Sequence, residues 1–331
     1  MDRQVLKGQK ILVTGGAGFI GSHLIDEFLN LGAKVTCLDN LSTGKLKNME
    51  SFWEDQSFDF IKGDIRNFKD CEDAATGCDF ICHQAALGSV PRSIKDPITT
   101  NEVNISGFLN ILEAARNGGV KRVVYAASSS TYGDSKILPK TEDEIGKPLS
   151  PYAVTKYVDE LYAHVYNISY GLETIGLRYF NVFGPRQDKD GAYAAVIPKF
   201  IAELVNHESP VINGDGSFSR DFTYIRNVVQ ANVLAFVSTD EKAVNEIYNV
   251  ACNERTTILE LIELLKKFLK DFDPDIYAVQ PDFGPKRAGD VSHSLASIDK
   301  IKEKLGYHPV YNINDGLKES INWYWNEFQI K

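Results

Sequence analysis

A tyrosine and a lysine stand four residues apart in the segment SPYAVTKYVDELY, residues 150–162. Ser150 and Pro151 are typical of a helix start, so Tyr152 and Lys156 are predicted to share one helical face. A free tyrosine, with a pKa of about 10, is a poor base at neutral pH, and a neighbouring ammonium group favours the phenolate. The pair is therefore a candidate for removing a proton from a hydroxyl group. A surface pair on any helix has the same spacing, so this interpretation needs supporting context.

Three serines, Ser128, Ser129 and Ser130, follow the apolar run at 122–126, which is a predicted strand. The carboxyl end of a strand is where a doubly wound sheet places the groups that contact a ligand. A serine hydroxyl can donate a hydrogen bond to a substrate oxygen and accept one in return. The serines are therefore candidates for the same site as Tyr152, although a serine-rich turn would have the same composition.

A glycine motif, TGGAGFIG, occupies residues 14–21. Gly15, Gly18 and Gly21 follow a predicted strand at 10–14 and precede a helix predicted from about Ser22 to Asn30. In this context the first glycine permits a tight turn, the second lets a pyrophosphate approach the backbone, and the third lets helix and strand pack closely. The helix N-terminus then faces the anion. The motif predicts a dinucleotide site, with a plain glycine-rich turn as the alternative.

An aspartate, Asp39, ends the second predicted strand, eighteen residues after Gly21. A carboxylate at this place accepts hydrogen bonds from a ribose 2′-hydroxyl and repels a 2′-phosphate. Asn40 follows it and no arginine stands beside it, so NAD is expected rather than NADP. Asp64 and Ile65 follow the third strand and are candidates for contacts with the adenine. Both aspartates are also common turn residues.

The elements that must position these residues alternate along the first two thirds of the chain. Strands are predicted at 10–14, 34–38, 59–62, 79–83, 122–126 and 174–179. Strands that alternate with helices indicate an α/β fold with a doubly wound parallel Rossmann sheet. From about Pro185 the pattern loosens, with helices predicted at 194–206, 225–237 and 257–269. We predict an NAD-binding domain at 1–184, completed by segments that return later, and mainly a smaller α/β substrate-binding domain at 185–331.

The amino-acid composition and net charge limit the classes of partner that the protein can be expected to bind. The chain has 331 residues, 43% of them hydrophobic, which is enough for a large core, and a net charge of −9. Without a basic field, neither nucleic acid nor an anionic membrane is an expected partner. Five cysteines, an odd count, favour a reducing compartment, and no apolar run reaches the length of a membrane span, so a cytoplasmic protein is expected. The histidines and cysteines show no metal-binding spacing, and we predict no metal site.

Together these motifs resemble the extended short-chain dehydrogenase/reductase family. The resemblance covers nearly the whole chain and rests on TGGAGFIG, Asp39, HQAA at 83–86, SSSTYG, YAVTK, RYFNVFGP at 178–185 and the late RAGD at 287–290. Within the family the chain is most similar to the UDP-hexose 4-epimerases of the UDP-N-acetylglucosamine 4-epimerase branch. The resemblance implies tightly bound NAD, a UDP-sugar substrate and a homodimer formed through helices near 101–117 and 151–170.

The resemblance also implies roles for individual residues. Tyr152 would be the base, Lys156 would bind the nicotinamide ribose and tune Tyr152, and Ser128 would take the place of the catalytic Ser/Thr. Further cofactor contacts would come from Phe19, Ile20, Ala85 and Ala86, beside the glycines and aspartates named above. Substrate contacts would come from Ser89, Arg92, Ser129, Ser130, Asn181, Asn213, Arg220, Arg287, Asp290 and Ser294, with Asn181, Arg220 and Arg287 on the diphosphate and Asn213 near the uracil.

The expected reaction is NAD-dependent C4 epimerisation through a 4-keto intermediate, preferentially of UDP-N-acetylglucosamine to UDP-N-acetylgalactosamine. Ser129 and Ser130 stand where the related sugar dehydratases carry an Asp-Glu pair, which disfavours water elimination. In this family a residue four positions after the Asp of RAGD limits the space beside the sugar C2, and here it is Ser294, a small residue. A UDP-hexuronic acid 4-epimerase, including one for N-acetylated substrates, is the alternative. A non-catalytic NAD-binding scaffold is a further one.

Overall fold

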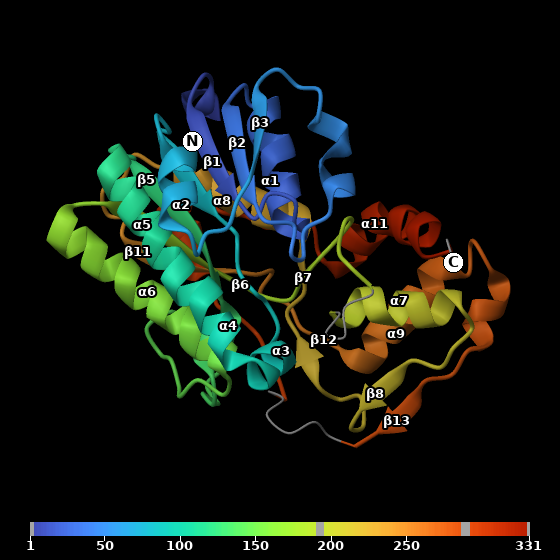
Figure 1. Ribbon diagram of the computed structural model, residues 1–331. Coiled ribbons are helices and arrows are strands. Elements are labelled where there is room, and N and C mark those ends of the chain that lie inside the picture. Colours follow the sequence, from blue (N-terminus) through green and yellow to red (C-terminus); the bar gives the residue numbers. More distant parts are fainter. Residues whose placement is uncertain (1–2, 190–194, 286–291, 330–331) are drawn as a thin grey trace.

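A seven-stranded parallel sheet forms the centre of the computed structural model, which describes residues 3–189, 195–285 and 292–329. The strand order is β11-β6-β5-β4-β1-β2-β3, and every neighbouring pair is parallel (Figure 1). The strands are β1 (Lys10–Thr14), β2 (Lys34–Asp39), β3 (Phe58–Lys62), β4 (Phe80–His83), β5 (Arg122–Ser128), β6 (Glu173–Tyr179) and β11 (Glu246–Val250). The predicted doubly wound Rossmann sheet is confirmed.

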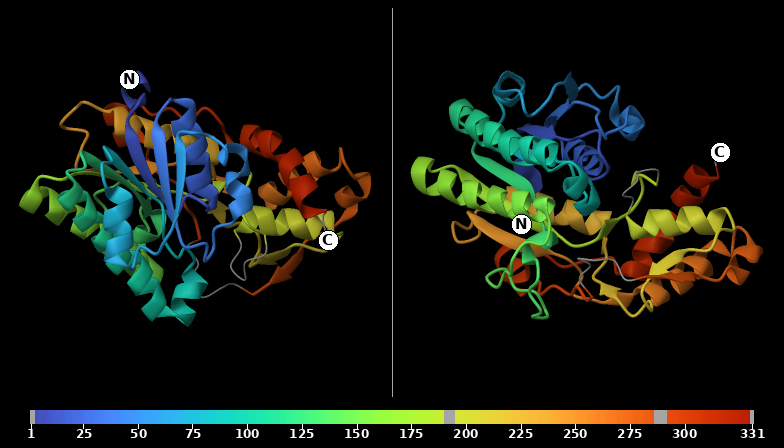
Figure 2. Two further views of the ribbon diagram at one scale, coloured as in Figure 1. Left: turned by 45° about the horizontal axis from the view of Figure 1, so that its top comes forward. Right: turned by 60° about the horizontal axis from the view of Figure 1, so that its bottom comes forward.

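Helices cover both faces of this sheet, as the views in Figures 1 and 2 show. One face carries α2 (Phe68–Ala75), α5 (Gly107–Gly118) and α6 (Pro151–Tyr170), and the other carries α1 (Phe19–Asn30) and α8 (Ile225–Val237). Strands enclosed on both faces are buried along nearly their whole length and are mainly apolar. Accordingly, all four residues of β4 are buried, and so are the last four of β1.

The strand β11, which sequence reasoning did not name, adds the seventh position beside β6. Its sequence, EIYNV, carries a polar residue, Asn249, at a fully buried position. Tertiary contacts satisfy that side chain: Asn249 Nδ2 donates to the carbonyl oxygens of Lys140 (3.0 Å) and Ser297 (3.1 Å), and Tyr132 Oη donates to Asn249 Oδ1 (2.6 Å). Because these partners are distant in the sequence, the pattern of β11 alone does not identify a buried strand.

A second group of elements lies to one side of the sheet, at the right of Figure 1. Its helices α7 (Val196–Val205), α9 (Ile258–Leu269) and α11 (Ile313–Phe328) pack against one another. Its strands pair only in twos: β7 with β10, β9 with β12, and β8 with β13. Their bounds are β7 (Val182–Phe183), β8 (Val211–Asn213), β9 (Ser219–Arg220), β10 (Thr223–Tyr224), β12 (Thr256–Thr257) and β13 (Asp282–Gly284). The remaining α-helices of the described ranges are α3 (Val90–Lys95), α4 (Pro97–Asn101) and α10 (Asp299–Leu305).

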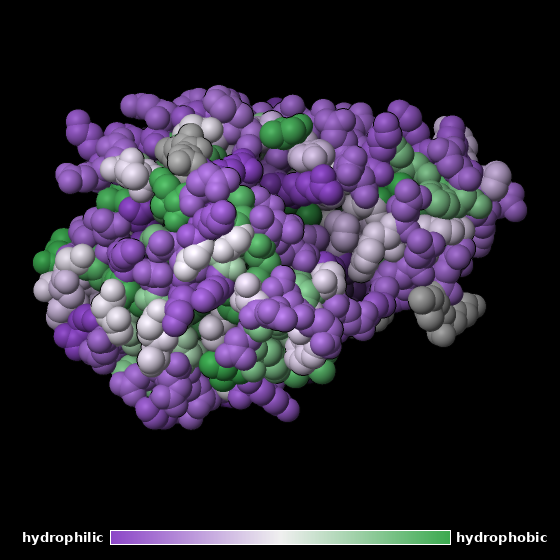
Figure 3. Space-filling model, turned by 90° about the horizontal axis from the view of Figure 1, so that it is seen from above, coloured by the Kyte–Doolittle hydropathy of each residue, from purple (hydrophilic) through white to green (hydrophobic). Residues whose placement is uncertain are grey.

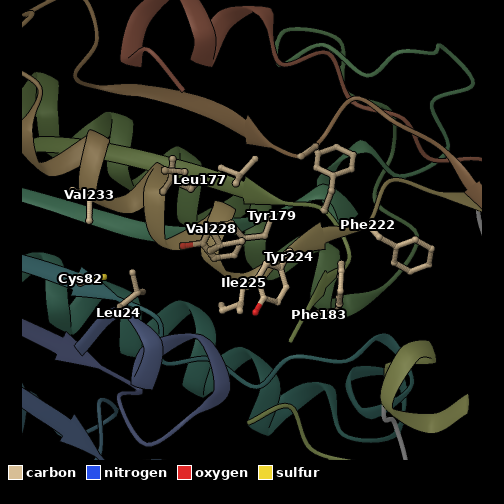
Figure 4. Packing of buried hydrophobic residues seen from close by; sticks show 14 of the residues in the cluster. Leu24, Cys82, Leu177, Tyr179, Phe183, Phe222, Tyr224, Ile225, Val228 and Val233 are labelled. Carbon is tan, nitrogen blue, oxygen red and sulfur yellow. The ribbon is translucent and has the colours of Figure 1, made fainter. Parts of the chain in front are cut away.

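One cluster of buried hydrophobic side chains joins the sheet to this second group. Figure 4 shows it running from Leu24 of α1 and Cys82 of β4, past Ile225 of α8, to Phe183 and Phe222. Because close-packed side chains resist displacement, this shared core fixes the second group against the sheet.

The outer surface is mainly polar. On the face shown in Figure 3, hydrophilic residues predominate and hydrophobic ones gather in small groups. All five cysteines are buried and free. Within the described ranges, none of the helices has the length and apolar character needed to cross a membrane.

Candidate active site

The glycine loop between β1 and α1 leaves no room for side chains. A Cβ on Gly15, where φ is +70°, would lie 2.7 Å from the Ala85 nitrogen, and one on Gly21 would lie 2.2 Å from the Gly15 carbonyl oxygen. The helix α1 begins at Phe19, three residues before the predicted start, with Gly18 as an N-cap that makes no side-chain capping bond. Uncapped backbone N–H groups at a helix N-terminus suit a phosphate. The loop therefore fits a dinucleotide pyrophosphate.

The carboxylate of Asp39 lies at the end of β2, close to this loop. Its Oδ2 accepts a hydrogen bond from the Ala17 N–H (3.0 Å) and its Oδ1 accepts one from the Leu41 N–H (2.7 Å). Burial raises the pKa of Asp39, and the N–H groups of Leu41 and Ala17 partly offset that rise. Each carboxylate oxygen can accept a second hydrogen bond, so the group retains capacity for ribose hydroxyls.

A cavity of about 490 Å³ extends from the glycine loop along the carboxyl ends of the strands. All of the predicted cofactor and catalytic residues line it, together with Ser129, a predicted substrate contact: Gly15, Gly18, Phe19, Ile20, Gly21, Asp39, Asn40, Asp64, Ile65, Ala85, Ala86, Ser128, Ser129, Tyr152 and Lys156. The sequence reasoning missed further lining residues, among them Ser42, Thr43, Gly44, Gln84 and Tyr179. Of these, Gly44 carries a signal in its residue type, because a Cβ there would lie 2.7 Å from the Ala17 Cβ. We refer to this space as the cofactor cavity.

The helix α6 brings Tyr152 and Lys156 to this cavity. It begins at Pro151, as predicted, and the Ser150 side chain caps it by accepting a hydrogen bond from the Ala153 N–H (3.1 Å). The Lys156 side chain is almost fully buried, and its Nζ donates to the Ala126 carbonyl oxygen (2.9 Å) and to Asp159 Oδ2 (3.2 Å). An ammonium group has three donors, so one remains for a ligand.

The hydroxyl of Ser128, at the end of β5, is oriented by its neighbour. Ser128 Oγ accepts hydrogen bonds from the Ser130 N–H (3.2 Å) and from Ser130 Oγ (2.9 Å). With both acceptor positions filled, the hydroxyl hydrogen of Ser128 is left to donate elsewhere. A phenol, an ammonium and a hydroxyl donor thus border one cavity, an arrangement suited to proton transfer at a hydroxyl group.

A second cavity, of about 950 Å³, shares Asn181 and Val182 with the first. We refer to it as the substrate cavity. Of the predicted substrate contacts, Ser89, Asn181, Asn213 and Arg220 line it. Arg220 Nη1 donates to the carbonyl oxygens of Ser219 (3.0 Å) and Ser292 (3.3 Å), so part of the guanidinium is held by the backbone.

Three of the remaining predicted residues, Arg92, Ser130 and Ser294, are hydrogen-bonded to residues in or next to the walls of these cavities. The backbone N–H of Arg92 donates to Ser89 Oγ (3.2 Å), and the N–H of Ser294 donates to the Ser219 carbonyl oxygen (3.0 Å). Ser130 acts through Ser128, as described above. Asp64 accepts from Asn40 Nδ2 (2.9 Å), and its ion pair with Arg66 holds the pKa of Asp64 well below its usual range. Arg287 and Asp290 lie outside the described residues.

Residues 11–251 match the model of the NAD dependent epimerase/dehydratase family. A UDP-glucose 4-epimerase of Mycolicibacterium smegmatis is 35% identical over 325 residues, which covers 97% of this chain and 100% of that protein. A solved UDP-N-acetylglucosamine 4-epimerase of Methanobrevibacter ruminantium, in complex with UDP-N-acetylmuramic acid, is 39% identical with a TM-score of 0.90, covering 97% of this chain and 99% of that one.

A UDP-glucuronic acid 4-epimerase of Bacillus cereus, solved with UDP-glucuronic acid and NAD, is also similar. It is 31% identical with a TM-score of 0.88, covering 96% of this chain and all of that one. The family match spans well over half of the chain, and the similarity to the relatives extends over nearly all of it. The predicted resemblance is therefore confirmed, and the chain belongs to the NAD-dependent epimerase/dehydratase family of extended short-chain dehydrogenase/reductase enzymes, with NAD as its cofactor.

Proposed function

We propose that this enzyme, an NAD-dependent UDP-sugar 4-epimerase, interconverts UDP-N-acetylglucosamine and UDP-N-acetylgalactosamine. The observation that carries the proposal is the junction of the two cavities at Asn181 and Val182. A sugar placed at this junction would lie between the residues that line the cofactor cavity and a cavity large enough for the nucleotide. Ser128 and Tyr152 line the cofactor cavity, and Arg220 lines the substrate cavity.

In the proposed reaction, Tyr152 removes the proton from the C4 hydroxyl while Ser128 donates a hydrogen bond to the same oxygen. Lys156 provides the positive charge that favours the phenolate. NAD, when bound, supplies the hydride chemistry at C4. Asn181 and Arg220 hold the diphosphate while the 4-keto sugar turns about it and presents its other face. The protein holds the sugar and the catalytic groups in one geometry, so they need not meet by diffusion, and this positioning removes a large part of the reaction barrier.

The preference for an N-acetylated sugar rests on Ser294. This residue is partly buried, and its N–H donates to the carbonyl oxygen of Ser219, whose sequence neighbour Arg220 lines the substrate cavity. A close-packed wall with a large side chain there would exclude additional heavy atoms at C2, because overpacking strains its surroundings. A serine leaves this space free. The solved UDP-N-acetylglucosamine 4-epimerase with 39% identity supports the same preference.

We also propose a homodimer through α6. Four aliphatic side chains are exposed on this helix: Val154 (46%), Leu161 (49%), Val165 (45%) and Ile168 (66%). Their spacings of seven, four and three residues place them on one helical stripe. A contiguous apolar stripe of this kind marks an interaction surface, and the same helix of a second copy would cover it. Light scattering of the purified protein tests this: a monomer at micromolar concentration would contradict it.

The experiment that tests the function is product analysis by NMR without added cofactor. The purified protein is incubated separately with UDP-N-acetylglucosamine, UDP-glucose and the two corresponding uronic acids, and the Tyr152→Phe variant serves as the control. We expect the C4 epimer of UDP-N-acetylglucosamine to form fastest. Faster conversion of a uronic acid would favour the UDP-hexuronic acid 4-epimerase instead, and no conversion of any substrate would favour a scaffold.

A further inference from the structure

A buried carboxylate lies directly beside Lys156. Asp159, one helical turn further along α6, is 1% exposed in its side chain, and Lys156 is 3% exposed. Lys156 Nζ lies 3.2 Å from Asp159 Oδ2, while Asp159 Oδ1 has no hydrogen-bond partner among the described residues. A buried carboxylate with one unsatisfied oxygen is costly, so a feature of this kind calls for a functional explanation.

The other carboxylate on this part of α6 is already neutralised. Glu160 forms a two-point ion pair with Arg178 of β6, with Nε–Oε1 and Nη2–Oε2 distances of 2.8 Å each. Such a bidentate pair satisfies both groups. Among the described residues, the one ion pair that Asp159 forms is with the ammonium of Lys156, and that ammonium is the charge assigned to Tyr152 in the proposed mechanism.

The neighbouring strands contribute groups that are neutral at physiological pH. Burial, and secondly the charge of Lys156, lower the pKa of His83 on β4 to about 3. Burial raises the pKa of Tyr125 on β5 well above its usual value. Burial also raises the pKa of Asp159 to about 7, and Lys156 partly opposes that rise. In the cluster around Lys156, the charge of Asp159 is therefore the one that varies near neutral pH.

We propose that Asp159 is a positioning residue that, with the Ala126 carbonyl, fixes two of the three N–H groups of Lys156 and moderates the charge that Tyr152 experiences. This rests on the proposed role of Tyr152 as the base. When Asp159 is ionised, its negative charge cancels part of the positive field of the Lys156 ammonium, and the phenolate form of Tyr152 is less favoured. When the side chain at position 159 is neutral, the full field of the ammonium acts on Tyr152. The geometry that supports this is the hydrogen bonding of Nζ to both partners, 2.9 Å and 3.2 Å.

The substitution Asp159→Asn separates charge from geometry. An asparagine has the same shape, and its Oδ1 can still accept the hydrogen bond from Lys156, but it carries no charge. We expect the ionisation midpoint of Tyr152 to move to lower pH, by less than the roughly 1 to 3 units caused by a directly adjacent charge, because Asp159 acts on Tyr152 through Lys156. The acid limb of the kcat/KM profile moves in the same direction. If the role of Asp159 were purely structural, Asp159→Asn would lower the stability of the protein but would move neither the ionisation midpoint of Tyr152 nor the acid limb of the kcat/KM profile.

The measurement is a tyrosinate absorbance titration of the NAD-bound protein. Each variant is compared with the same variant carrying Tyr152→Phe, so that the difference isolates the Tyr152 phenol and needs no substrate. The matched control is Glu113→Gln on α5, which removes a carboxylate from another pair spaced three residues apart, with Arg116, and should not move the midpoint.

An unchanged or raised midpoint in Asp159→Asn overturns the proposal. If that variant does not fold, Asp159→Ala is titrated in the same way, with the same downward shift expected and weaker retention of NAD, because Lys156 loses one acceptor. Failure of the proposed function has a different signature: the wild-type protein would convert no UDP-sugar, yet the titration would still report whether Asp159 acts on Tyr152.

Discussion

The two cavities of this enzyme are built in different ways. The cofactor cavity lies at the carboxyl ends of adjacent strands in one wide sheet. Most of the residues that form it lie at or just after the ends of β1, β2, β3, β4 and β5, and α6 adds Tyr152 and Lys156. The substrate cavity is assembled from residues as far apart as Ser89 and Ile258, and several of them stand on strands of only two residues, such as β7 (Val182–Phe183) and β9 (Ser219–Arg220).

Because of this difference, we expect the cofactor cavity to serve the reaction itself and the substrate cavity to select the substrate. A strand in the middle of a parallel sheet is held by hydrogen bonds on both sides, so the cofactor site cannot change without disturbing the core. Loops and short strand pairs tolerate substitution far better, and they carry specificity in many enzymes. We therefore expect variants of the cofactor cavity to act on every substrate alike, and variants near the substrate cavity to change the ranking of substrates.

The largest effect is expected for Tyr152→Phe. Loss of the phenolic hydroxyl removes the proposed base, and general-base catalysis contributes a factor of about 10² to 10⁴. Turnover should fall by that factor on UDP-N-acetylglucosamine and UDP-glucose equally, with NAD still bound. Tyr157→Phe, one residue beyond Lys156 on the same helix, is the control and should leave turnover near that of the wild type. Near-native turnover in Tyr152→Phe would identify a different base.

The next effect concerns the glycine loop. An alanine at Gly21 would place Cβ 2.2 Å from the Gly15 carbonyl oxygen, so the loop or α1 must shift. We expect Gly21→Ala to lose bound NAD and to be destabilised by about 1–3 kcal/mol, the cost typical of overpacking. Gly118→Ala is the control, since its Cβ would lie 3.5 Å from the Ala75 carbonyl oxygen, an ordinary contact. The NAD released on denaturation and the thermal midpoint are measured. Full NAD occupancy in Gly21→Ala would show that the loop adapts.

In the substrate region, Ser294→Tyr tests whether specificity resides there. A tyrosine should cost the acetylated substrate about 1–3 kcal/mol of binding, or roughly 5-fold to 150-fold in kcat/KM, while UDP-glucose keeps or gains activity. Ser294→Ala, which adds no volume, should leave the ratio of the two kcat/KM values unchanged. An equal loss on both substrates in Ser294→Tyr would remove this residue from the argument for N-acetyl preference.

The smallest effect involves a contact that joins the two regions. His23 of α1 donates from Nε2 to the Pro185 carbonyl oxygen (2.9 Å), and burial, followed by the charge of Arg186, lowers the pKa of His23 to about 4. Between pH of about 6.5 and 4 the unfolded chain therefore binds more protons than the folded protein at this residue. Its contribution to the free energy of unfolding falls as the pH is lowered through that window.

The variant His23→Gln keeps a donor for Pro185 and removes the titration. Its free energy of unfolding should fall less between pH 7 and pH 4.5 than that of the wild type, by about 1–2 kcal/mol. Denaturant unfolding at the two pH values gives the difference, and comparing the variant with the wild type cancels the other titrating groups. If the free energy of unfolding fell by the same amount in the variant and in the wild type between these two pH values, His23 would not titrate in this pH range.

The sequence determined most of the cofactor half. The glycines at 15, 18 and 21, the strand-terminal Asp39 and the pair Tyr152 and Lys156 were all predicted, and all line one cavity. They could be predicted because each depends on local rules: a backbone turn that only glycine permits, a carboxylate at a strand end, and two side chains one helical turn apart.

Only the tertiary structure decided the rest. It placed the Ala126 carbonyl on the ammonium of Lys156, buried Asn249 in an unpredicted strand against the Ser297 carbonyl, and brought the Ser292 carbonyl to Arg220. The reason is physical: a buried polar group must find its partners wherever the folded chain brings them. Those partners are tens of residues away in the sequence, so no local pattern identifies them.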